Sequence, residues 1–86
     1  MNSIESLIGE LMLISEAVSM QSERVGSASA DIYQIIETVQ AEFGDKSSSQ
    51  ALLYALMEAV KTLAHATSNL NQLRNEIANY CIRLSQ

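Results

Sequence analysis

The 86-residue sequence contains no proline, no tryptophan, three glycines, one phenylalanine and three tyrosines. Small β-sandwiches and barrels depend on Gly- and Pro-rich turns and on aromatic residues, so this composition favours long uninterrupted helices. The single cysteine cannot form an internal disulfide, and one cysteine with one histidine cannot complete a structural zinc site. A chain this short without a cross-link buries only a small core by itself, so we expect it to need a partner.

Basic residues are scarce and unevenly distributed. Five Lys and Arg stand against ten Asp and Glu, for a net charge of −5. Residues 1–43 hold seven acidic and one basic residue, whereas residues 44–86 hold three acidic and four basic residues. Binding to nucleic acid or to an anionic membrane surface requires a basic stripe. We therefore expect neither partner.

The sequence also lacks a long hydrophobic run. No stretch approaches the roughly 18 uncharged apolar residues of a membrane span. The N-terminus has no basic region, and Glu5, Glu10 and Glu16 interrupt its apolar residues, so it does not resemble a secretory signal peptide. We expect a protein that is cytoplasmic before any export, and export would need a signal of another kind.

Apolar residues recur at intervals of three and four, which is typical of helices and not of strands. One such pattern begins at Ile4 and a second at Leu52, separated by a short polar segment. The sequence predicts an all-α fold, an antiparallel hairpin with helices over about 3–43 and 49–85 and a turn at 44–48.

The predicted contact positions of the first helix are Ile4, Leu7, Leu11, Ile14, Val18, Gln21, Val25, Ala28, Ile32, Ile35, Val39 and Glu42. Those of the second helix are Leu52, Leu56, Ala59, Leu63, Ala66, Leu70, Leu73, Ile77, Tyr80 and Leu84.

The predicted turn carries a glycine and several possible helix caps. Gly44 is expected to adopt the left-handed conformation that often ends a helix. Ser47 with Gln50 fits a capping box for the second helix, and Ser48 is an alternative N-cap. The candidate caps of the first helix are Asn2 and Ser3.

Several large apolar residues fall outside the predicted contact positions. In an antiparallel pair they collect at the two ends of the hairpin, so we predict that they bind a partner. The alternative is that they only widen the contact between the two helices. The predicted partner-binding residues are Met12, Leu13 and Ile82 at the open end, and Ile36, Phe43, Leu53, Tyr54 and Met57 near the turn.

Residues capable of chemistry are few and isolated. His65 falls at an outward position, and Cys81 is better explained as a small buried side chain than as a reactive thiol, although oxidation between two copies stays an alternative. Ser47, Ser48 and Ser49 lack a base that could activate a nucleophile. We expect no enzyme activity, no cofactor and no metal.

The short chain, its two equal helices and its central glycine resemble the WXG family of type VII secretion substrates. The likeness is closer to the small WXG-like adaptors that accompany LXG toxins in Gram-positive bacteria. It extends over the whole chain as a pattern, but its specific motifs are weak. The residues that carry it are Phe43, Gly44 and Asp45, followed by Ser49, Gln50, Ala51, Leu52, Leu53 and Tyr54.

The sequence departs from the family pattern at two places. The family tryptophan is missing, because Glu42 lies two positions before Gly44 and Phe43 adjoins it. The C-terminal export signal of the family has an acid four residues after an aromatic, whereas here Tyr80 is followed at that spacing by Leu84. A partner chain would then have to supply the export signal.

The resemblance implies a non-enzymatic protein that pairs side by side with another helical protein into a four-helix bundle, as a homo- or hetero-oligomer, or binds the helical N-terminal region of an LXG toxin. It would act as a secreted substrate, adaptor or targeting factor. The alternative hypothesis is an intracellular coiled-coil scaffold or chaperone subunit of another assembly.

Overall fold

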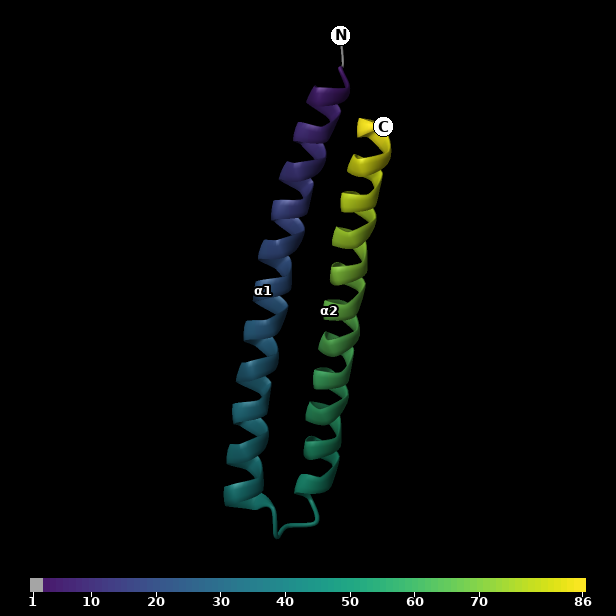
Figure 1. Cartoon of the computed structure of the whole chain (residues 1–86). Coiled ribbons are helices and arrows are strands. Elements are labelled where there is room, and N and C mark those ends of the chain that lie inside the picture. The colour runs from purple at the N-terminus through teal and green to yellow at the C-terminus, as the bar shows by residue number, and fades with distance from the viewer. Residues whose placement is uncertain (1–2) are drawn as a thin grey trace.

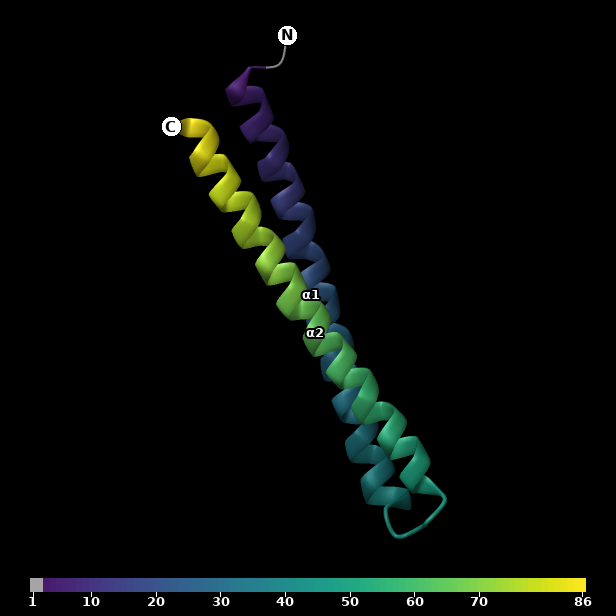
Figure 2. The same cartoon turned by 90° about the vertical axis from the view of Figure 1, so that its right-hand side faces the viewer.

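The computed structural model describes residues 3–86 and consists of helices α1 (Ile4–Phe43) and α2 (Ser49–Ser85). The helices run antiparallel and side by side along their whole length, so the two chain ends lie together, opposite the turn (Figures 1 and 2). The molecule measures 64 × 15 × 15 Å. The predicted all-α helical hairpin is confirmed.

Helix α1 begins with a side-chain cap. The Ser3 hydroxyl accepts a hydrogen bond from the Ser6 N–H at 3.1 Å, and the Ser3 carbonyl accepts one from Leu7. The negative charge of Glu5, in the first turn, interacts favourably with the positive end of the helix dipole. Asn2, the other candidate cap, lies outside the described residues.

The end of α1 differs from the prediction at Gly44. This residue has φ −64° and ψ −23°, which is right-handed, and its N–H donates to the Gln40 carbonyl at 3.2 Å. A Cβ atom at Gly44 would overlap that carbonyl oxygen. Glycine is therefore required here by close backbone approach, and the prediction of a left-handed conformation was wrong.

The start of α2 also differs from the prediction. Ser48 has helical angles and makes no side-chain cap, because such a cap needs an extended residue. The Gln50 N–H binds the Ser47 carbonyl at 3.3 Å, so the predicted capping box does not form. Instead the Ser49 hydroxyl donates to the Lys46 carbonyl at 2.7 Å, and Ser49 is only 5% exposed.

The core of the hairpin is narrow. Its buried hydrophobic residues are Val18, Ile36 and Val39 of α1 and Ile77 of α2, and none of the described residues has a fully buried large side chain. Two helices cover only one strip of each other's surface. The core is therefore a single row of contacts between the helices.

Nine of the 22 predicted contact positions are exposed, and most of these are displaced by one residue. Val18, Val39 and Ile77 are buried as predicted. Ile35 is exposed, and the residue after it, Ile36, faces the other helix instead. The large predicted contact residues that are exposed are Ile4, Leu7, Ile14, Ile35, Leu52, Leu73 and Tyr80.

Two alanine substitutions test the different roles of the glycines. Gly26→Ala should raise the free energy of unfolding by about 1 kcal/mol, because an added Cβ meets nothing within 4 Å and alanine is the better helix former. Gly44→Ala should lower it by about 1–3 kcal/mol through the clash with Gln40. Urea unfolding followed by circular dichroism measures both, and equal effects would contradict this account of the turn.

The position of the core can be tested with two isoleucines of the same helix. Ile77→Ala should reduce the free energy of unfolding by about 2–3 kcal/mol, because the side chain is buried. Ile82→Ala removes the same atoms from a side chain that is 56% exposed and should cost less than about 0.5 kcal/mol. Similar losses for both variants would show that the contact strip is wrongly placed.

Candidate protein-interaction site

The helix pair has two broad faces, one on each side of the contact between α1 and α2. One of them, the pocket face, carries residues that directly follow contact positions, including Tyr33 of α1 and Met57, Ala64 and Ala78 of α2. Three shallow pockets on this face are lined by residues of both helices. A fourth pocket, of about 380 Å³, lies on the other side of the contact and is lined by Asp31, Gln34, Ile35, Thr38 and Val39 of α1.

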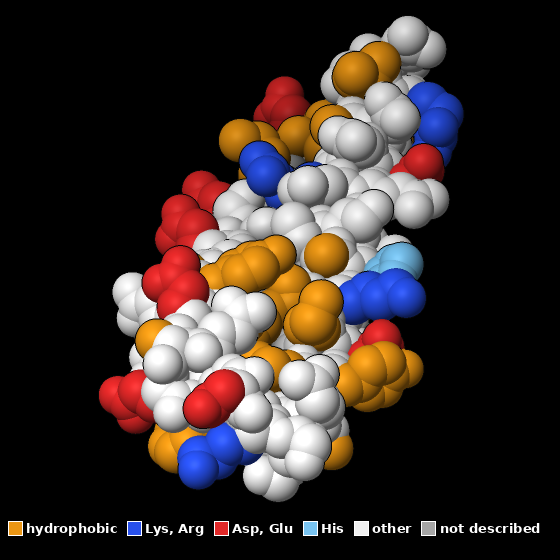
Figure 3. All heavy atoms as spheres, turned by 90° about the horizontal axis from the view of Figure 1, so that it is seen from below, with side chains coloured by type: hydrophobic (Ala, Val, Ile, Leu, Met, Phe, Trp, Pro, Cys, Tyr) orange, Lys and Arg blue, Asp and Glu red, His pale blue; other side chains and the backbone are white. Residues whose placement is uncertain are grey.

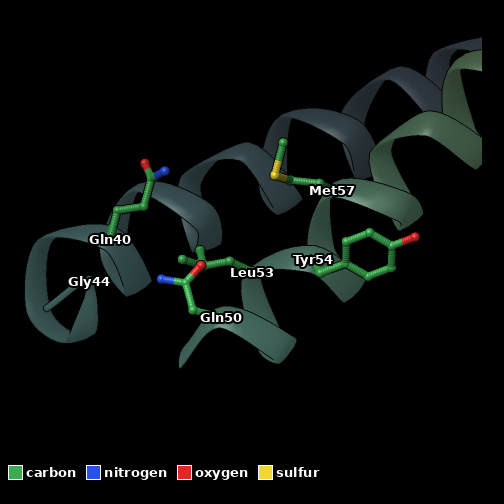
Figure 4. A pocket seen from close by; sticks show the side chains of 6 residues that line it. All are labelled: Gln40, Gly44, Gln50, Leu53, Tyr54 and Met57. Carbon is green, nitrogen blue, oxygen red and sulfur yellow. The ribbon is translucent and has the colours of Figure 1, made fainter. Parts of the chain in front are cut away.

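A pocket of about 550 Å³ lies at the turn end of this face (Figure 4). Gln40 and Gly44 line it from α1 and the turn, and Leu53 and Met57 line it from α2, together with Gln50 and Tyr54. The Tyr54 ring lies at the far end from Gly44. The walls combine apolar side chains with the amides of Gln40 and Gln50. Such a lining suits contact with another protein better than binding of a small charged ligand.

A smaller and more apolar pocket of about 290 Å³ adjoins it. Met57 lines both pockets, so the two adjoin at this side chain. The remaining walls come from Tyr33, Ile36, Val60 and Ala64, with Lys61 at the rim. Such pockets between two helices can accept apolar side chains projecting from a third helix.

The structure separates the partner-binding residues predicted near the turn into two groups. Tyr54 and Met57 are more than 60% exposed and Phe43 is 45% exposed, so all three are accessible. Leu53 is half-buried, although it lines the larger pocket. Ile36 is buried and belongs to the core, because it occupies the contact position that the sequence pattern had assigned to Ile35.

The residues predicted at the open end are all exposed. Met12, Leu13 and Ile82 are each more than half exposed, but none of them lines any of the four pockets described for this chain. They supply apolar surface without a hollow to receive a side chain. Residues predicted near the turn therefore line pockets, whereas those predicted at the open end do not.

Acidic side chains border the pocket face. Glu16, Glu23 and Glu37 follow one another at multiples of seven residues on the outer side of α1, and all three are exposed. In the view from the turn end, hydrophobic side chains gather in the middle of the molecule and acidic side chains line one edge (Figure 3). This arrangement favours a partner with basic residues next to its apolar ones.

The groups considered for chemistry stay apart in the structure. His65 is exposed, and Cys81 is half-buried at a contact position. Among residues 3–86, no group of three or more His, Cys, Asp or Glu side chains could hold a metal ion. Neither described helix is long and apolar enough to cross a membrane.

The opposite face, here called the stripe face, was not recognised as a surface from the sequence. It carries Leu7, Ile14, Ile35, Leu52, Leu73 and Tyr80, which are between 36% and 51% exposed. The spacing of three and four residues does not distinguish such flanking positions from true contact positions when both are apolar. The sequence did carry one signal, because it holds more apolar residues than one partner helix can cover.

Comparison with known proteins gives no relative for this chain: no protein-family model, no curated protein and no solved structure matches it. The resemblance to WXG-like proteins therefore rests on the sequence pattern alone.

Proposed function

We propose that this protein is a non-enzymatic interaction module that binds a helical segment of another protein on its pocket face. The observation that carries the proposal is the pair of adjoining pockets between the helices, which share Met57 as a lining residue. A preformed apolar groove flanked by polar residues is the usual receptor for an amphipathic helix.

The charges around the groove indicate which charged residues the partner helix should carry. Glu37 lies on the acidic side of α1, close to Tyr33 along the helix, and Lys61 lies at the α2 rim of the smaller pocket. A helix with apolar residues on one face and basic residues toward α1 would match both features. Complementary charge sets the orientation and the rate of encounter more than the affinity.

The resemblance to WXG-like adaptors supports placing this activity in type VII secretion. In that role the partner is the helical N-terminal region of an LXG-type toxin, and the hairpin accompanies it as adaptor, targeting factor or co-secreted substrate. An intracellular scaffold or chaperone subunit would use the same groove. The two roles differ in whether the chain leaves the cell.

Binding is tested by co-expressing the chain with the proteins encoded beside it and measuring the purified complexes by light scattering. Met57→Glu should abolish complex formation, because it places a charge in the wall shared by both pockets. Met20→Glu is the matched control, since Met20 is 55% exposed and lines none of the described pockets. Both variants should stay helical by circular dichroism.

Equal loss of the complex in the two methionine variants would contradict a site on the pocket face. Location is tested separately by immunoblotting the culture medium and the cells of the native host. Recovery in the medium, dependent on the type VII ATPase, supports the secretion role. Retention in cells that export other substrates normally would favour the scaffold.

A further inference from the structure

We infer that Arg74 binds a carboxylate side chain of the partner helix, and that this contact fixes the position of the partner along the pocket face. This role of Arg74 rests on the proposed function, because it requires a helix bound on that face. The site is the third pocket of the pocket face, which has a volume of about 480 Å³ and a mostly polar lining.

Arg74 is a charged residue at a position that faces the other helix. The residues of α2 that turn toward α1 follow one another at alternating steps of three and four. They are Leu53, Leu56, Val60, Leu63, Thr67, Leu70, Arg74, Ile77, Cys81 and Leu84. Nine of these ten residues are buried or half-buried and uncharged, whereas Arg74 is exposed. Its long side chain therefore leaves the contact between the helices and reaches the surface.

Helix α1 places small hydroxyl side chains on the opposite side of the contact. Ser15, Ser22 and Ser29 recur at intervals of seven residues among the positions that turn toward α2, and all three are half-buried. Ser15 lines the same pocket as Arg74. A large apolar residue in its place would fill the space beside the guanidinium group, so the serine helps to keep the pocket open.

The lining of this pocket suits a carboxylate. The lining residues are Ser15, Asn71, Arg74, Asn75 and Ala78. An arginine presents parallel N–H donors that match the two oxygens of a carboxylate, and amide and hydroxyl groups beside it can donate further hydrogen bonds. None of the side-chain hydrogen bonds within residues 3–86 uses the guanidinium group of Arg74. Its donors are therefore free to bind a group of the partner.

The acidic residues of α1 restrict what the pocket can accept. Glu16 and Glu23 are exposed and directly follow Ser15 and Ser22, so they lie on the α1 border of the pocket face. They repel a free anion such as phosphate, whereas a helix with basic residues toward α1 neutralises them and brings its own carboxylate to Arg74. The bound group is therefore an aspartate or glutamate of an amphipathic helix, and not a free anion.

The separation of the polar and apolar pockets determines where this acidic residue lies in the partner. Met57 and Arg74 are about 17 positions apart, or about 26 Å along a helix that rises about 1.5 Å per residue. A partner helix lying along the groove should carry its acidic residue about 17 positions from the residue that contacts Met57. Sliding the partner by one helical turn would move the carboxylate about 5 Å away from Arg74, so the contact selects one register.

Titration calorimetry measures this contact with the protein that is encoded beside the chain and co-purifies with it. Arg74→Gln should raise the dissociation constant about tenfold, and Arg74→Glu about a hundredfold, because the glutamate also repels the carboxylate. Arg74→Lys should recover only part of the affinity, because an ammonium group lacks the parallel donors of arginine.

Arg83→Glu is the matched control for these variants. It makes the same change of charge on the same helix, but Arg83 directly precedes the contact residue Leu84 and lines none of the described pockets. Its dissociation constant should stay within about twofold of the wild-type value, because screening by salt weakens the effect of a distant exposed charge.

Crosslinking and charge reversal identify the carboxylate itself. A photo-crosslinking amino acid in place of Ala78 marks the partner segment over the polar pocket, and one in place of Ala64 marks the segment over the smaller apolar pocket. The two marked sites should lie about 14 residues apart in the partner. Replacing the acidic residue at the first site by lysine should weaken binding to the wild type and restore binding to Arg74→Glu.

Urea unfolding of the free hairpin separates binding from a role within the chain. Arg74→Gln should leave the urea midpoint unchanged, because the side chain makes none of the hydrogen bonds within residues 3–86. A lower midpoint with unchanged affinity for the partner would show that Arg74 pairs with Glu16 or Glu23 of its own chain. That result would overturn the inference.

Two further results would also overturn it. One is wild-type affinity of Arg74→Glu for a partner that Met57→Glu no longer binds, which would leave the proposed function intact. The other is a crosslinked segment over the polar pocket that contains no acidic residue. Unchanged binding by both Met57→Glu and Arg74→Glu would instead refute the proposed function, and the contact with it.

Discussion

The contact between two long helices is the constraint on which the rest of this structure depends. Each helix can cover only one strip of the other, whereas apolar residues occupy a much wider part of both. Val18, Ile36, Val39 and Ile77 fill the strip, and none of the described large side chains is fully buried. The remaining apolar surface lies on either side of the strip and gives the molecule two faces with different character.

The two faces differ in how their apolar residues are distributed. On the pocket face, two pockets share Met57 near the turn, and polar residues such as Asn71 and Asn75 line the pocket farther along it. On the stripe face, large apolar residues recur along most of the hairpin, from Leu7 to Leu52, and the small residues Ala28 and Ala66 lie between them.

The candidate site could be predicted only in part. Tyr54 and Met57 stood out because they are large apolar residues outside both heptad patterns, and they line the turn-end pocket. Ile36 was assigned to the same site although it is buried. The contribution of Gln40 and Gly44 to the pocket could not be predicted. It depends on how α1 packs against α2 and not on residue type.

The sequence by itself determined the two helices and the place of the turn. Its apolar residues recur with a period near 3.6, which matches a helix and not a strand, and no proline interrupts either helix. It did not determine which strip of each helix makes the contact. Adjacent apolar pairs such as Leu7 with Ile8, Ile35 with Ile36 and Leu52 with Leu53 satisfy a heptad in either of two phases, one residue apart. Only the packing of α1 against α2 chose between them, because one helix can accept just one member of each pair. The other member remained exposed, and so became part of a surface.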